Sequence, residues 1–79
     1  MAKFFPVEGD AQEVPTPLTL TALQGYVVGW INFIELSSGD VLVVNEMADG
    51  WTPMNINATY ILGFPVYGNV VLCSPSEIA

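Results

Sequence analysis

Asparagine and glutamate side chains gather in the second half of the chain, where they could form a polar binding site. Asn45 and Glu46 end a predicted strand, and Asn55, Asn57 and Thr59 surround the start of a predicted helix. Amide and hydroxyl groups both donate and accept hydrogen bonds, so this set suits a polar ligand or partner. The same residue types also cap helices and form turns. The pattern predicts a binding site and leaves a purely structural role open.

Catalysis and metal binding have few residues to draw on. The chain has no histidine, which excludes imidazole acid–base catalysis, histidine-activated nucleophiles and histidine metal sites within one chain. Glu35 and Glu46 could face each other across a hairpin, but no EF-hand-type loop accompanies them. Cys73 is the single cysteine and is interpreted as a small buried apolar residue. We therefore expect a non-enzyme without a metal ion or cofactor.

Aromatic residues form the second group of candidate contacts. Trp51 follows an Asp-Gly turn, where a place in the core is less expected, so it is predicted to anchor a partner. Trp30, Ile34 and Tyr67 are predicted to lie in a subunit interface. Packing inside the core is the other interpretation for Trp30 and Tyr67.

The charge balance is strongly acidic. One basic residue, Lys3, stands against eight acidic residues and leaves a net charge of −7. This charge disfavours a DNA or RNA groove and binding to anionic membranes. Yet 52% of the residues are hydrophobic and only 11% are charged, which is more apolar surface than one small core needs. A chain of 79 residues is only marginally stable as a monomer, so the composition predicts a homo-oligomer.

The hydrophobic pattern predicts one small domain of the α+β class, with a small antiparallel β-sheet, a central hairpin and one or two short helices. The domain covers residues 1–79, and residues 74–79 are expected to form a frayed tail. The predicted strands cover residues 4–7, 26–36, 40–47 and 66–73.

Capping residues set the expected bounds of the helices. Thr16 is the expected N-cap of the first helix and Gly25 its C-terminal stop. The second helix is predicted to begin after Asn55 or Asn57 and to end at Gly63. No stretch is long and apolar enough for a membrane span, and the first residues lack the apolar core of a signal peptide. We therefore expect a cytoplasmic protein.

The order of these segments resembles a small family found mainly in phages and mobile elements, which is catalogued only as a domain of unknown function. The resemblance spans about residues 18–73 and rests on Leu23, Gln24, Gly29, Ile31, Glu35, Asn45, Glu46, Asn55, Asn57, Ala58, Gly68 and Val71. The family has a second glycine where this chain has Trp30. The resemblance implies a phage-type origin and a fold, and it implies no activity.

Two functions are expected from these features. In the first, the chain neutralises a component of host anti-phage defence by binding a protein target, with Glu8, Asp10 and Glu13 meeting a basic partner. In the second, it is a sponge that sequesters a cyclic-nucleotide-type immune signal between subunits, with Thr16, Thr59 and a helix N-terminus at the phosphates. A structural role in a phage assembly is a third possibility. Each places the protein in the cytosol of a bacterial host.

Overall fold

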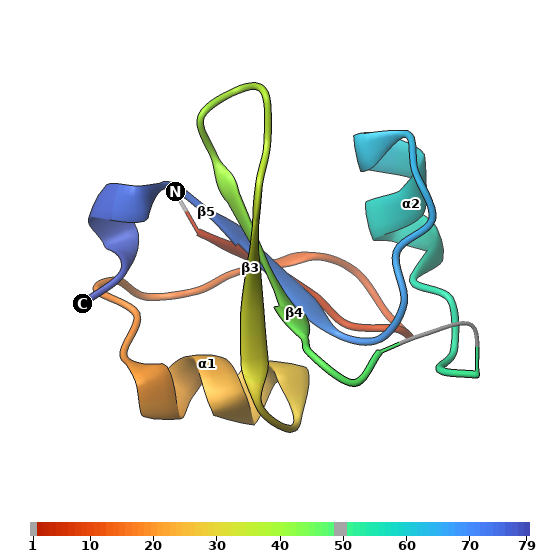
Figure 1. The fold of residues 1–79 in the computed structure, drawn as a ribbon, viewed down its shortest axis with the longest axis horizontal. Coiled ribbons are helices and arrows are strands. Elements are labelled where there is room, and N and C mark those ends of the chain that lie inside the picture. The colour runs from red at the N-terminus through yellow and green to blue at the C-terminus, as the bar shows by residue number, and fades with distance from the viewer. Residues whose placement is uncertain (1, 49–50) are drawn as a thin grey trace.

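The computed structural model describes residues 2–48 and 51–79 of the chain. Figure 1 shows a twisted sheet with a helix on either side of it, which confirms the predicted α+β class. In chain order the elements are β1 (Lys3–Phe5), β2 (Gln12–Glu13), α1 (Leu20–Val27), β3 (Ile31–Glu35), β4 (Val41–Asn45), α2 (Ile56–Leu62), β5 (Val70–Cys73) and the 3-10 helix η1 (Pro75–Glu77).

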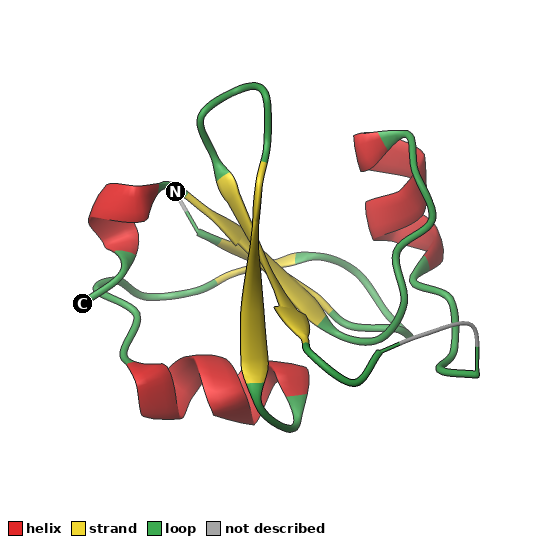
Figure 2. Ribbon diagram, in the orientation of Figure 1, coloured by secondary structure: helices red, strands yellow, loops and turns green. Residues whose placement is uncertain are grey.

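The sheet is antiparallel throughout the described residues, with the strand order β2-β1-β5-β4-β3. The predicted hairpin is present as β3 and β4, and Phe33 lies opposite Val43 at its centre. Its turn includes Gly39, whose φ of 92° lies in the left-handed region that glycine tolerates. In this order β4 is an interior strand and β3 is an edge strand (Figure 2).

The first helix begins and ends later in the chain than predicted. Its N-cap is Thr19, whose hydroxyl accepts the N–H of Ala22, so the expectation that Thr16 caps this helix is wrong. Gly25 does not end the helix, which continues to Val27. The two further residues place Val27 one turn after Leu23 on the buried face, and this burial outweighs the low helix propensity of glycine.

As a result, residues 26–30 are not part of a strand, although their aromatic and β-branched side chains predicted one. The second helix agrees with expectation, because Asn55 is its N-cap and Gly63 its left-handed C-cap.

The core has two halves, one on each face of the sheet. Odd-numbered residues of β4, such as Val43, pack with Leu23 and Val27 of α1. Even-numbered residues such as Leu42 pack with Ala58 of α2. This alternation follows from the two-residue repeat of a strand, and it makes β4 apolar on both faces.

The C-terminal residues 74–79 are held to the domain in place of the predicted frayed tail. Leu18 donates its N–H to the carbonyl of Glu77 (2.7 Å) and accepts the N–H of Ala79 (2.8 Å). The Glu77 carboxylate accepts the main-chain N–H of Ser74 at 2.8 Å and so closes the one-turn η1. The hydrogen bonds to a buried segment explain why the end of the chain is ordered.

The Glu77 contact predicts a specific pH dependence of stability. The N–H of Ser74 holds the pKa of the Glu77 carboxyl below its usual value of 4.5. A group whose pKa is lowered by folding stabilises the folded chain above its unfolded pKa, and this contribution is lost as the pH falls through the folded pKa. We expect wild type to exceed the Glu77→Gln variant in urea midpoint at neutral pH, and the gap to close well below pH 4.5. A gap that is the same at both pH values would contradict this role.

Candidate functional site

Asn55, predicted to bind a ligand, is completely buried and acts inside the fold. Its Oδ1 accepts the N–H of Ala58 at 3.1 Å, and its Nδ2 donates to the carbonyls of Phe5 (2.8 Å) and Gly68 (2.9 Å). Both amide hydrogens are therefore used within the chain. The predicted binding role of Asn55 is wrong, and the structural interpretation holds.

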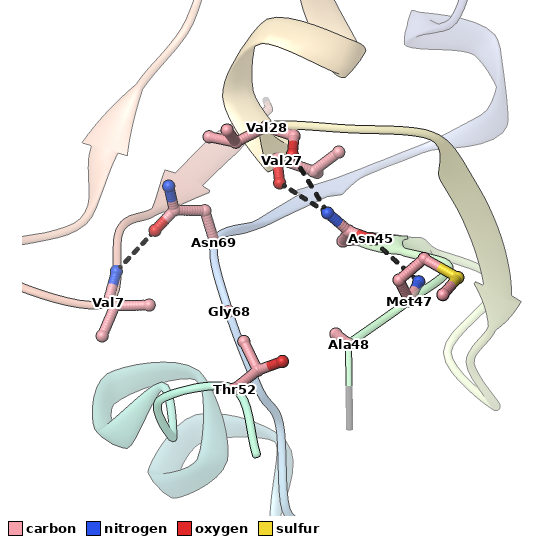
Figure 3. Close-up of a pocket in the computed structure, with 9 residues that line it drawn as sticks. All are labelled: Val7, Val27, Val28, Asn45, Met47, Ala48, Thr52, Gly68 and Asn69. Carbon is pink, nitrogen blue, oxygen red and sulfur yellow. Dashed lines mark hydrogen bonds between the residues drawn. The ribbon is translucent and has the colours of Figure 1, made fainter. Parts of the chain in front are cut away.

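Asn45 has a similar role at the end of α1 (Figure 3). Its Nδ2 donates to the carbonyls of Val27 and Val28, each at 3.2 Å, and its Oδ1 accepts the N–H of Met47 at 2.8 Å. The close approach requires Gly29, because a Cβ at that position would lie 2.7 Å from Nδ2 of Asn45. Asn45 therefore ties the end of α1 to β4.

A hollow of about 310 Å³ lies beside Asn45. Figure 3 shows Asn69 on its far side, where Oδ1 accepts the N–H of Val7 at 2.8 Å. No basic side chain is among the residues that line it, and Lys3 lies on β1 directly opposite Glu13. A phosphate-bearing ligand would find no cation here, although such ligands are normally held by charge-assisted hydrogen bonds.

The other predicted polar residues lie apart from this hollow. Asn57 is exposed on α2 and donates through Nδ2 to the carbonyl of Gly9 at 3.1 Å. Thr59 accepts the N–H of Val66 at 2.9 Å and so fixes the segment that follows α2. Glu46 is exposed just after β4. The structure therefore does not gather the predicted polar set into one pocket.

The outer side of α2 is apolar and exposed. Ile56 and Tyr60, one helical turn apart, are 70% and 87% exposed. Trp51, in the loop that leads into α2, is 96% exposed, so the expectation that it lies outside the core is confirmed. Its predicted role as a partner anchor stays a prediction. The sequence-based prediction of the site did not include Ile56 and Tyr60, although their i, i+4 spacing indicates a shared helix face.

Acidic residues lie next to this apolar face. The hydrogen bond from Asn57 to Gly9 holds the loop that contains Glu8 and Asp10 against the start of α2. Glu13, which was predicted to act with them, instead sits in β2 opposite Lys3. We use the name acidic-aromatic surface for these exposed residues: Glu8 and Asp10 of the loop bound to α2, Ile56 and Tyr60 of α2, and Trp51 of the loop that leads into α2.

A second apolar area follows the β3 edge, where Trp30 is 68% exposed and Phe33 and Ile34 are also exposed. Of the predicted interface residues, Ile34 and Tyr67 line one hollow of about 170 Å³, whereas Trp30 lies just before the strand. An adjoining hollow of about 450 Å³ separates the hairpin from α2 and is lined in part by Ile34, Leu36, Ile61 and Phe64.

Comparisons with family models, with curated proteins and with solved structures found no match. The resemblance to the phage family therefore stays a prediction. Within residues 2–48 and 51–79, no three histidine, cysteine, aspartate or glutamate side chains are grouped to hold a metal ion. None of the helices described there has the length and apolar character needed to cross a membrane.

The burial of Asn55 predicts a large difference between two asparagines of the same helix. Asn55→Ala removes the N-cap of α2, at a cost of about 1 kcal/mol. It also removes the hydrogen bonds that Asn55 donates to two buried carbonyls, at a cost of about 1–3 kcal/mol each. We expect a total loss of about 3 kcal/mol or more in the free energy of unfolding, measured by urea denaturation. Asn57→Ala, which removes one exposed hydrogen bond, should cost less than about 1 kcal/mol. Equal losses would contradict the structural role of Asn55.

Proposed function

We propose that this chain is a non-catalytic binding protein that neutralises a protein target by occupying it through the acidic-aromatic surface. The observation that supports this most directly is the Asn57–Gly9 hydrogen bond, which keeps Glu8 and Asp10 beside the exposed side of α2. Two carboxylates and a large aromatic area on one face suit a target whose cleft is basic and partly apolar.

The two kinds of residue contribute different parts of the binding. Trp51 and Tyr60 are the residue types that carry most of the free energy at protein interfaces, where one such side chain is worth about 2 kcal/mol or more. The carboxylates of Glu8 and Asp10 add to a net charge of −7, which accelerates association with a basic partner and disfavours acidic ones. Specificity in this scheme comes from charge, and affinity comes from the aromatic side chains.

The resemblance to a family of phages and mobile elements directs this proposal to a host protein. We place the chain in the bacterial cytosol, as a homo-oligomeric accessory protein that disables a component of anti-phage defence. A basic cleft is common in proteins that handle nucleic acids, because they bind phosphates through lysine and arginine. Such a protein is the class of target that the acidic-aromatic surface fits.

Affinity capture from bacterial lysate tests this function when matched variants are compared. The protein that wild type captures should be depleted at least tenfold with Tyr60→Ala and with Glu8→Lys. Glu46→Lys is the control, because it also changes the net charge from −7 to −5 but lies outside the surface. Raising the salt concentration should weaken capture, since screening removes the charge contribution.

Two outcomes would count against target binding through this surface. One is equal capture by wild type, Tyr60→Ala and Glu8→Lys. The other is a mass increase of one nucleotide per chain or per subunit pair in native mass spectrometry with a panel of cyclic nucleotides. The second outcome would replace target binding with sequestration of a signal.

A further inference from the structure

We propose that two copies of this chain pair through the β3 edge, antiparallel about a two-fold axis at Phe33, and form one continuous sheet of ten strands. The pairing deepens the homo-oligomeric part of the proposed function and names its interface. It does not use the acidic-aromatic surface, so pairing and target binding can fail independently.

The hydrogen bonds of the hairpin show which main-chain groups point away from it. Leu36 donates to the carbonyl of Asp40 (2.9 Å), and Glu46 donates to the carbonyl of Trp30 (2.9 Å). Even-numbered residues of this strand therefore bond to β4, and the N–H and C=O groups of Ile31, Phe33 and Glu35 point outward. Within the described residues no strand lies on that side. Such an edge is a template for another strand.

The two edges of the sheet differ in their length and in the side chains that they expose. The β2 edge has only two residues, both exposed, and one of them is Glu13. The β3 edge has five residues, with exposed Phe33 and Ile34 at its centre. The edges are four strand spacings apart, or about 19 Å, which exceeds the Debye length of about 8 Å at physiological salt. The charge of β2 therefore has little effect at β3.

A two-fold axis at Phe33 lets all five residues of β3 pair. Ile31 then lies opposite the partner's Glu35, and Phe33 lies opposite the partner's Phe33 on the face that carries α1. Glu35 is the one charged residue of the strand, and in this register it lies about 14 Å along the strand from the partner's Glu35. A parallel pairing in register would place the two carboxylates side by side, where like charges destabilise.

The two ends of β3 provide the fit that favours a second copy over another protein. Trp30 stands directly before β3 and lines a hollow of about 240 Å³ with Gly29 and with Gln24 of α1. In the antiparallel pair, the partner's Trp30 comes opposite Leu36, beside the hollow of about 450 Å³ between the hairpin and α2. Each copy thus supplies a large exposed side chain at one end of β3 and a hollow at the other, which is lined by apolar residues together with Glu35, Ser37 and Ser38. A two-fold interface requires this self-complementarity.

Asn32 sets the balance between the single chain and the pair. Its Oδ1 accepts the outward N–H of Phe33 at 2.9 Å, which satisfies the central donor of the edge when no partner is present. Pairing exchanges this bond for one to the partner's main chain. Asn32→Val removes the competing acceptor and adds a β-branched residue, so it should strengthen pairing.

Single cysteine substitutions test the register directly. In the proposed register the Cα atoms of residue 33 in the two copies are about 5.5 Å apart, which suits a disulfide. Phe33→Cys should therefore form a covalent dimer on mild oxidation. The equivalent atoms at position 32, or at position 34, are about 8 Å apart or more, so Asn32→Cys and Ile34→Cys should link poorly. The native Cys73 does not compete, because it is buried and its burial raises its pKa.

Linking at position 32 or 34 in preference to 33 would overturn the register, and linking at none would overturn the pairing. Sedimentation of the unmodified protein over a concentration series gives an independent measurement. Trp30→Ala should weaken dimerisation at least tenfold, whereas Trp51→Ala, a matched truncation on the other surface, should leave it unchanged. Added salt should strengthen dimerisation, since it screens repulsion between two chains of charge −7, and it should weaken capture of a basic target.

A monomer at all concentrations, or equal effects of Trp30→Ala and Trp51→Ala, would overturn the proposed pairing. Neither result would bear on the acidic-aromatic surface. Conversely, loss of target capture with Tyr60→Ala while the dimer persists would concern the target-binding surface alone.

Discussion

One buried amide, the side chain of Asn55, joins parts of the molecule that no continuous helix or strand connects. Its oxygen caps α2, and its nitrogen binds main-chain carbonyls of β1 and of the segment before β5. A buried amide is tolerated only when its groups are hydrogen-bonded, so all three contacts must form together. Because α2 has seven residues and cannot be stable alone, its position depends on this amide. The placement of Tyr60 depends on it in turn.

Most asparagines near the sheet likewise form hydrogen bonds within the chain. Asn45 holds the end of α1, and Asn69 holds the chain after β1. The side-chain amides that were candidates for binding a ligand thus form hydrogen bonds that join short elements of the fold. The groups left for other molecules are mostly apolar and acidic, which suits recognition of a protein more than of a phosphate-bearing ligand.

Sequence patterns predicted the hairpin well because β4 is apolar on both faces and a short turn joins it to β3. They misplaced the start of β3 because Tyr26 and Val27 favour a strand locally, whereas burial of Val27 against the sheet extends α1. They also could not separate a capping asparagine from a binding one. The contact that decides the role of Asn55 is to Phe5, fifty residues away in the chain, and nothing local encodes it.

The two surfaces of the molecule make different demands on its charge. A net charge of −7 favours a basic target and opposes self-association, so an edge proposed to pair must be nearly neutral, and β3 carries only one charged residue, Glu35. The proposed pairing at β3 uses none of the residues of the acidic-aromatic surface, so a dimer would present that surface twice. Two linked binding surfaces raise the effective affinity for a target that is itself symmetric or repeated, without any new contact. Self-association would in this way strengthen target binding, even though the negative charge that attracts a basic target also opposes the pairing of two copies.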